Sequence, residues 1–348
     1  MKYKIIYLED QPAHSIKDDL ERANFDIIVN DADNFDVALS DMKNETDAYL
    51  MDFRLTANKG NVDAPTFAST LRTFGKNHKS KPIVLISNEQ NLPEFENDFT
   101  SQDLFDFVVG KKAFRDNIEK YSNRIRSLIE SYKAIELESY NISKVLDIEN
   151  LNIIDYRLID KLNAAKSKNN TYAFCRIIYY TIIRSVGLLV GKDVLAARLG
   201  IDQSSQDFDS FLDKISNCKY SGILSSSYDR WWFHKVTEFW NNISGNKSLR
   251  RTNASERVEI INQALGLKLA PATPLKHATS SNFWTICAVT NKPLDPNEGY
   301  VYSKKELEAW QEQEYISLYA ALEYPENRVY LSPIDRNEIF ELSKNATF

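Results

Sequence analysis

Short apolar runs alternate with longer amphipathic stretches along the first 135 residues of the 348-residue chain. Each apolar run gives way to polar residues at its C-terminal end, a pattern typical of repeated strand–helix units. The runs predict strands near residues 3–8, 26–29, 48–52, 82–87 and 106–110. The amphipathic stretches predict helices near residues 13–24, 35–44, 64–77, 91–98 and 114–136. Strict alternation of this kind predicts an α/β fold around a parallel sheet.

The rest of the chain has predominantly helical spacing. Helices are expected near residues 155–166, 171–190, 192–200, 206–217, 228–244 and 254–265. After Leu267, Pro-rich connectors lead to short strand-like runs, of which RVYLS at residues 328–332 is the last. The expected organisation is an α/β core, its last helix with a linker, a helical domain and a small terminal α+β module. These four parts are expected to span residues 1–112, 113–138, 139–266 and 267–348.

The helix expected at residues 114–136 carries apolar residues with a heptad-like 3-4-3-4-3 spacing. These residues are Ile118, Tyr121, Ile125, Leu128, Tyr132 and Ile135. One interpretation is an amphipathic helix that packs on its own sheet. The other is a signalling helix that forms the seam of a homodimer.

Length and cysteine content narrow the class of protein. A chain of 348 residues is too long for one ordinary core, so two or three domains are expected. The three cysteines are widely spaced, which favours reduced thiols over a disulfide framework or a zinc site. No signal peptide is expected, and the longest apolar stretch, near residues 177–190, is too short to span a bilayer. We therefore expect a cytoplasmic protein that does not bind a membrane.

Charge is unevenly divided along the chain. Residues 1–112 carry 13 Lys and Arg against 20 Asp and Glu, whereas residues 113–348 carry 30 against 29. This balance argues against binding nucleic acid through a large basic surface. The stretch 191–212 has the outline of a helix-turn-helix, but its second helix is rich in aspartate and would repel phosphates. DNA is therefore not expected as a partner.

Polar residues that can carry chemistry follow four of the predicted strands at the point where each strand ends. Glu9 and Asp10 end the run KIIYLED, Asp52 ends DAYLMD, Ser87 ends PIVLIS and Lys111 follows FDFVVG. In an open parallel sheet, ligands bind beyond the carboxyl ends of the strands. Three carboxylates, a hydroxyl and an amine at one edge suit a divalent cation and a phosphoryl group.

This set of strand-end residues resembles the receiver domain of bacterial response regulators, which is phosphorylated on one aspartate. The resemblance covers residues 1–135 and implies a CheY-like, flavodoxin-like sheet with the strand order 2-1-3-4-5. It implies that Asp52 is the nucleophile toward a phosphohistidine or a small phosphodonor. It also implies that Ser87 and Lys111 bind phosphoryl oxygens.

The same resemblance implies Mg²⁺ as the cofactor. Glu9, Asp10 and Asp52 would hold the ion directly or through water, and the backbone carbonyl of Arg54 would complete the site. Catalysis would then consist of positioning the transferred group and neutralising its charge.

The chain departs from the family's pattern at several positions. Lys112 follows Lys111 where the family has proline, so Lys112 is the alternative lysine. Asn88 replaces the usual small residue after the hydroxyl. Phe107, with Val108 as the alternative alignment, takes the place of the family's switch aromatic. These departures leave open a site that binds without chemistry.

The leading hypothesis is a response-regulator-like signalling protein that passes its signal to a C-terminal protein-interaction region. The phosphodonor would be a histidine kinase or a kinase-like ATPase. Receivers with an arginine after the phospho-acceptor, here Arg54, and a helical extension resemble those encoded beside such ATPases in bacterial antiviral systems. The alternatives are a DNA-binding transcriptional regulator with an atypical output domain and a pseudo-receiver scaffold.

No enzyme is expected in the C-terminal part of the chain. Residues 113–348 contain no motif for a nucleophile–base pair, a metal site or a dinucleotide. The receiver itself would catalyse only its own phosphoryl acceptance and dephosphorylation.

Overall fold

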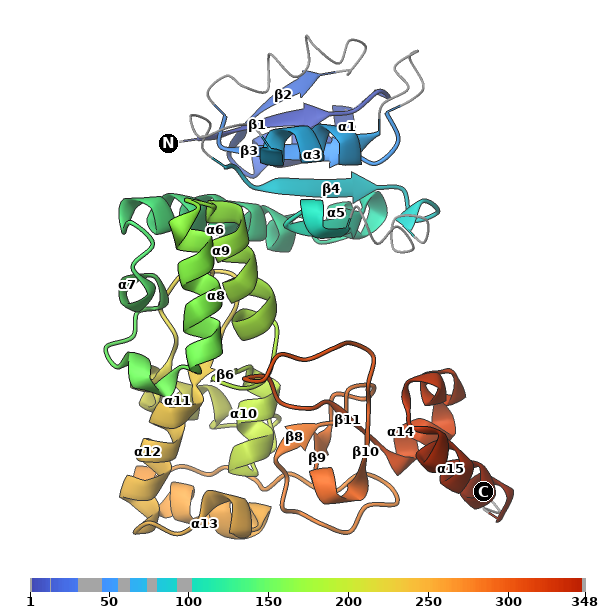
Figure 1. Cartoon of the computed structure of the whole chain (residues 1–348). Coiled ribbons are helices and arrows are strands. Elements are labelled where there is room, and N and C mark those ends of the chain that lie inside the picture. The colour runs from blue at the N-terminus through green and yellow to red at the C-terminus, as the bar shows by residue number, and fades with distance from the viewer. Residues whose placement is uncertain are drawn as a thin grey trace. The chain divides into compact units, whose positions relative to one another are not determined.

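The computed structural model of the chain describes residues 2–12, 14–30, 46–55, 63–73, 80–92 and 102–345 (Figure 1). The chain divides into two compact units, each assembled from separate segments. Unit 1 comprises Met1–Leu151, Tyr156–Tyr179 and Gly222–Tyr228. Unit 2 comprises Asn152–Asp155, Tyr180–Ser221 and Asp229–Phe348. The finer division expected at residues 112, 138 and 266 stays a prediction.

Unit 1 is built on a five-stranded parallel sheet with the order β2-β1-β3-β4-β5. The strands are β1 (Tyr3–Leu8), β2 (Phe25–Asn30), β3 (Ala48–Asp52), β4 (Ile83–Ser87) and β5 (Phe107–Gly110). Each lies within one residue of a predicted apolar run, so the predicted fold and strand order are confirmed. Every residue of β3 and β4 is buried, as expected for central strands of a parallel sheet covered on both faces.

The helices of unit 1 come from both residues 1–135 and the region after them. They are α1 (His14–Arg22), α3 (Ala64–Thr73), α5 (Lys111–Asp116), α6 (Ile118–Leu137), α7 (Ile142–Leu146), α8 (Tyr156–Ser167) and α9 (Thr171–Ile178), with the 3₁₀ turn η1 (Gln102–Leu104). The helix predicted at 114–136 is instead two helices, because Asn117 leaves helical geometry with a φ of −132°. The helices predicted at 35–44 and 91–98 lie outside the described residues.

Helix α6 carries the residues with heptad-like spacing, and most of them are buried inside unit 1. Ile125, Leu128, Tyr132 and Ile135 are each 3% exposed or less. The helix packs against α1, α5 and α9. The seam is therefore used for packing within the chain, and a homodimer through this helix stays an untested prediction.

A short segment from far along the chain, Gly222–Tyr228, also belongs to unit 1 and lies against α6. The backbone N–H of Leu224 donates to Ser131 Oγ at 3.1 Å, and Ser226 Oγ donates to Ser127 Oγ at 2.9 Å. Leu224 is buried although its φ is +66°, a region that leucine rarely adopts. We call Gly222–Tyr228 the strap.

Unit 2 consists of helices and short paired strands. Its helices are α10 (Lys192–Leu199), α11 (Phe208–Lys214), α12 (Phe233–Ser244), α13 (Ala254–Leu265), α14 (Leu318–Glu323) and α15 (Pro333–Asn345). Its strands are β6 (Leu189–Val190), β7 (Trp231–Trp232), β8 (Thr285–Ile286), β9 (Pro293–Leu294), β10 (Gly299–Val301) and β11 (Tyr315–Ser317). Its short turns of 3₁₀ or π helix are η3 (Tyr179–Ile183, whose first residue belongs to unit 1), η4 (Ser216–Cys218), η5 (Leu249–Arg251), η6 (Pro296–Glu298) and η7 (Pro325–Tyr330).

The predicted elements of unit 2 are confirmed in part. Helices α10, α11, α12 and α13 match predicted helices. Leu189 and Val190, predicted at the end of a helix, and Trp231 and Trp232, predicted at the start of another, instead pair as the strands β6 and β7. The run RVYLS, predicted as a strand, overlaps the 3₁₀ helix η7.

The helix-turn-helix-like stretch is part of the core of unit 2. Residues 194–199 of α10 are all buried. Gly200 ends the helix with a φ of +71°, and a Cβ at this position would lie 2.6 Å from the Cα of Ala254. The helix is therefore packed inside the unit. None of the helices in the described ranges is both long and apolar enough to cross a membrane.

Candidate functional site

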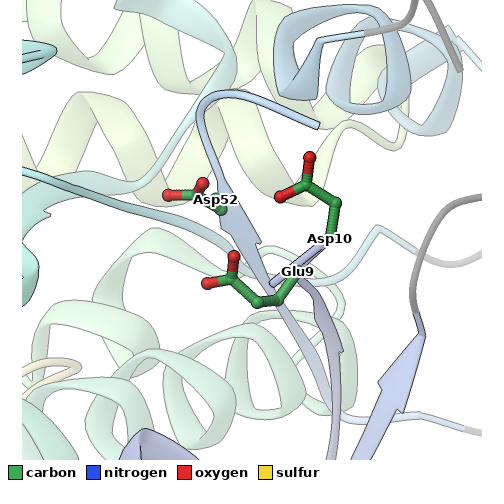
Figure 2. Close-up of side chains that lie close together, drawn as sticks. All are labelled: Glu9, Asp10 and Asp52. Carbon is green, nitrogen blue, oxygen red and sulfur yellow. The ribbon is translucent and has the colours of Figure 1, made fainter. Parts of the chain in front are cut away.

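The register of the sheet brings three carboxylates to one edge. Leu8 pairs with Met51 across β1 and β3, so the residues that follow, Glu9 and Asp52, leave neighbouring strands side by side. One carboxylate oxygen from each of Glu9, Asp10 and Asp52 lies within 4.8 Å of the other two (Figure 2). All three side chains are largely buried. Three negative charges in such a cleft call for nearby positive charge.

Lys111 begins α5 directly after β5 and supplies one positive charge. Its Nζ lies 2.5 Å from Glu9 Oε2 and 3.3 Å from Asp52 Oδ1. Burial lowers the pKa of Lys111, but the hydrogen bond to Glu9 and the two negative charges raise it overall. The side chain of Lys112 is exposed. The structure therefore brings Lys111, and not the alternative Lys112, to the carboxylates.

Asp52 lies in an environment that disfavours its charged form. Burial raises the pKa of Asp52 to about 6; Lys111 opposes this rise and the charge on Glu9 adds to it. Asp52 Oδ1 is buried and accepts no hydrogen bond within the described part of the chain, although it faces the ammonium group of Lys111. A cation at this oxygen would stabilise the ionised carboxylate.

Ser87 lies on the strand next to Asp52. Asp52 pairs with Ile86 across β3 and β4, so Ser87 is one residue further toward the carboxyl edge. Its Oγ is fully buried and has no hydrogen-bond partner among the residues that the structure describes. A buried hydroxyl without a partner costs free energy, which a ligand oxygen could recover. The predicted role of Ser87 is consistent with this geometry.

The placement of Arg54 does not test its predicted role as a ligand of the cation. Its side chain is exposed, and its guanidinium lies 5.5 Å from the centroid of the Phe53 ring. The predicted role concerns its backbone carbonyl and stays a prediction.

Tyr7 is a residue of this site that the sequence analysis missed. Its hydroxyl donates to Glu9 Oε2 at 2.6 Å, and the side chain is fully buried on β1. Burial raises the pKa of Tyr7 well above its ordinary value, and the charges of Glu9 and Asp52 add to this rise. This contact could have been predicted from the sequence, because Tyr7 and Glu9 are two residues apart along β1 and its end, and residues two apart on a strand point to the same face.

Glu89 is a second missed residue. Its Oε1 accepts hydrogen bonds from the backbone N–H groups of Lys112 and Ala113, at the N-terminus of α5. The pKa of Glu89 is lowered, mainly by hydrogen bonds from backbone N–H groups. A Cβ on Gly110 would lie 2.5 Å from this same Oε1. The pair therefore fixes the first turn of the helix that carries Lys111.

Phe107, the expected switch aromatic, is buried against α6. Its ring stacks on Tyr121 with centroids 6.1 Å apart, and the guanidinium carbon of Arg124 lies 4.2 Å from its centroid. The same guanidinium carbon lies 5.6 Å from the ring of Tyr228 in the strap. The position therefore connects β5 to α6 and the strap.

Comparisons with known proteins match the chain only through solved structures. No family model matches the chain, and a search of curated proteins found no match. A receiver domain from Methylobacillus flagellatus is 21% identical, with 36% of this chain and 99% of that chain covered and a TM-score of 0.30. The receiver domain of a sensor histidine kinase from Pseudomonas aeruginosa, described with a magnesium ion in its active-site cleft, is 18% identical, with 37% and 99% covered and a TM-score of 0.30.

A streptococcal redox sensor, described as evolved from two-component response regulators, is 19% identical. The match covers 39% of this chain and 55% of that chain, with a TM-score of 0.31, so this chain spans about half of the sensor's length. Likenesses with scores of this size carry no conclusion about activity. The strand order and the residues at the strand ends show that the N-terminal segment has the CheY-like receiver fold.

Proposed function

We propose that the chain is a response-regulator-like signalling protein that accepts a phosphoryl group on Asp52 with the help of Mg²⁺. The observation that carries this proposal is the convergence of three carboxylates and Lys111 at the carboxyl edge of the sheet. Catalysis of phosphoryl transfer depends on positioning and on neutralising the charge of the transferred group. The residues at this edge can supply both.

The acidic cluster fits a divalent cation. Three ionised carboxylates and one ammonium group leave two negative charges uncompensated in the cleft. Mg²⁺ prefers carboxylate oxygens together with water, and it would supply the missing positive charge when bound. Glu9, Asp10 and Asp52 are the residues that would hold it, with the carbonyl of Arg54 as a proposed further ligand.

In the proposed reaction, a carboxylate oxygen of Asp52 forms a bond to phosphorus. The bond from phosphorus to the donor's nitrogen or oxygen breaks at the same centre, and the donor leaves with that electron pair. Lys111 and Ser87 would bind phosphoryl oxygens, a role supported by the fully buried Ser87 Oγ, which has no hydrogen-bond partner in the described ranges.

The donor that we propose is a histidine kinase or a kinase-like ATPase. The resemblance of the Asp52–Arg54 region extends this proposal to the ATPases of bacterial antiviral systems. The C-terminal region would act through contact with a protein partner. The signal would reach it through α6 and the strap, because Arg124 contacts both Phe107 and Tyr228.

The first test is the intact mass of the protein after incubation with acetyl phosphate and Mg²⁺. We expect one phosphoryl adduct on the wild type, and none on Asp52→Asn or without Mg²⁺. Asp26→Asn is the matched control, because Asp26 is an exposed carboxylate on β2, away from the cluster. An adduct that persists in Asp52→Asn would contradict the assignment of the nucleophile. Absence of any adduct, with acetyl phosphate and with a phosphorylated histidine kinase, would favour the pseudo-receiver scaffold.

A further inference from the structure

Glu9 is held by two donors from different elements of unit 1. The Tyr7 hydroxyl, from β1, lies 2.6 Å from Glu9 Oε2, and Lys111 Nζ, from α5, lies 2.5 Å from the same oxygen. The other carboxylate oxygen, Oε1, accepts a longer hydrogen bond of 3.3 Å from the backbone N–H of Gln11. The two strong donors therefore share one acceptor.

Lys111 cannot serve every acceptor of the site equally well. Its ammonium group already forms ion pairs with both Glu9 Oε2 and Asp52 Oδ1. A phosphoryl group on Asp52 would add negative charge next to Asp52 and draw the ammonium group toward it. If Lys111 were the sole donor to Glu9 Oε2, this shift would leave a buried carboxylate oxygen without a hydrogen bond, which is costly.

We propose that Tyr7 is a positioning residue that keeps Glu9 hydrogen-bonded while Lys111 moves from Glu9 to a phosphoryl group on Asp52. The inference rests on the function proposed above. Tyr7 suits this role because its side chain is fully buried, so water does not compete for its hydroxyl. It is also a neutral donor, so it holds Glu9 without cancelling the negative charge that a cation would bind.

The neighbouring strand offers a matched control in Tyr49. Tyr49 is buried on β3 and pairs with Ile6, so it lies on the opposite face of the sheet from Tyr7. It belongs to the hydrophobic cluster that includes Ile6 and Leu8, on the face of the sheet opposite to Tyr7. Tyr49→Phe therefore removes a buried hydroxyl from the same sheet without touching the acidic cluster.

The first experiment needs neither Mg²⁺ nor a phosphodonor. Hydrogen exchange of the β1 amides is compared in the wild-type full-length chain, Tyr7→Phe, Lys111→Met and the double variant. Each donor can replace the other at Glu9 Oε2, so we expect the double variant to exchange at least tenfold faster than the product of the single effects predicts. A double variant equal to that product would show that the two donors are independent, and would overturn the proposal.

The second experiment measures the rate of the phosphoryl adduct and the affinity for Mg²⁺ by calorimetry. We expect Tyr7→Phe to slow adduct formation by roughly tenfold, because Lys111 is then retained on Glu9, while the affinity for Mg²⁺ changes by less than about threefold. Tyr49→Phe should change neither quantity. In a Lys111→Met background, Tyr7→Phe should have little further effect on the rate.

The outcomes separate this inference from the proposed function. A wild type that takes no phosphoryl group contradicts the proposed function, and the exchange experiment still decides whether Tyr7 and Lys111 share Glu9. A parallel loss of adduct rate and Mg²⁺ affinity in Tyr7→Phe would show that Tyr7 merely maintains the cation site, and would overturn the positioning role.

Discussion

Asp52 is a buried carboxylate whose charged form is disfavoured by burial and favoured by the nearby Lys111. Its carboxylate is close to two other acids and to Lys111, and its pKa is raised to about 6 chiefly by burial. In the unfolded chain the same group has a pKa of about 3.9. Between these values the folded protein binds more protons than the unfolded chain. The contribution of Asp52 to stability is therefore most favourable below about pH 4, and it is lost as the pH rises through about 6.

Without Mg²⁺, Asp52→Asn should stabilise unit 1 at pH 8 by up to about 3 kcal/mol, because it removes a costly buried charge. At pH 4 the variant and the wild type should differ little, and Mg²⁺ should reduce the difference at pH 8. Hydrogen exchange of the β3 amides measures this, and an equal stabilisation at both pH values would contradict the prediction.

Gly110 is a second position where one atom decides the local geometry. A Cβ there would approach Glu89 Oε1 to 2.5 Å, and this oxygen accepts the N–H groups of Lys112 and Ala113. We predict that Gly110→Ala displaces the Glu89 side chain and lowers the free energy of unfolding of α5 by about 1 kcal/mol. Unfolding measured by hydrogen exchange of α5 would test this. In a Glu89→Ala background the cost of Gly110→Ala should largely disappear; a cost that persists in full would show that it does not arise through Glu89.

At the level of elements, the strap is held by hydrogen bonds to two serine hydroxyl groups of α6. Ser131 Oγ accepts from the N–H of Leu224, and the exposed fraction of Ser131 is only 2%. We predict that Ser131→Ala leaves this N–H unpaired. The free energy needed to open the strap should then fall by about 1–3 kcal/mol. Ser122 is the control on the same helix, because its Oγ is equally buried and has no hydrogen-bond partner within the described residues.

Hydrogen exchange of the strap amides provides the measurement. Exchange should become faster in Ser131→Ala and stay unchanged in Ser122→Ala. Equal effects of the two substitutions would show that the strap is held by burial alone and not by this hydrogen bond.

The strands and the acidic cluster could be predicted from the sequence because the information is local. Each strand is an apolar run that ends in a polar residue, and the strand order then brings Glu9 and Asp52 together. Trp231 and Trp232 were expected in a helix because their neighbours have helical spacing. In the structure they pair with β6, an interaction across some forty residues that local spacing does not encode.

The remaining differences also have local explanations that a pattern of apolar residues does not show. The run RVYLS has residues that favour strands, but proline precedes it at 325 and follows it at 333, and the chain forms η7 there. The break at Asn117 does not disturb the apolar spacing, so the pattern predicted one helix where two exist. The hydroxyl of Tyr7 was counted as part of an apolar run, which hid its contact with Glu9.

At the scale of the whole molecule, the distribution of tryptophan offers a reporter. All five tryptophans, Trp231, Trp232, Trp240, Trp284 and Trp310, belong to unit 2, whereas Asp52 belongs to unit 1. We predict that the phosphoryl adduct on Asp52 changes the tryptophan fluorescence of the wild type, because the proposed signal leaves unit 1 through the strap. Asp52→Asn should show no change under the same conditions. A full adduct by mass without a fluorescence change would contradict transmission to the tryptophan-containing unit.

The assignment of α8 and α9 to unit 1 could not be read from the sequence. Their apolar spacing predicts helices, and both helices are present, although α9 ends at Ile178 and not near residue 190. Spacing does not say which surface a helix covers, and α9 packs against α6. Arg72, at the end of α3, also lies 3.6 Å from the ring centroid of Tyr172 on α9. The receiver segment is therefore completed by residues that follow it by more than thirty positions.

The alternation of the chain between its two units has an evolutionary consequence. A chain that diversifies by exchanging its whole downstream part requires a breakpoint after which nothing belongs to the first unit. Here a single crossover near residue 138 would remove α9 and the strap together with unit 2. A recombinant of that kind would keep the parallel sheet but lose the residues of α9 and the strap that pack against α6. The two units are therefore expected to descend as one lineage, with changes in one selected in the presence of the other.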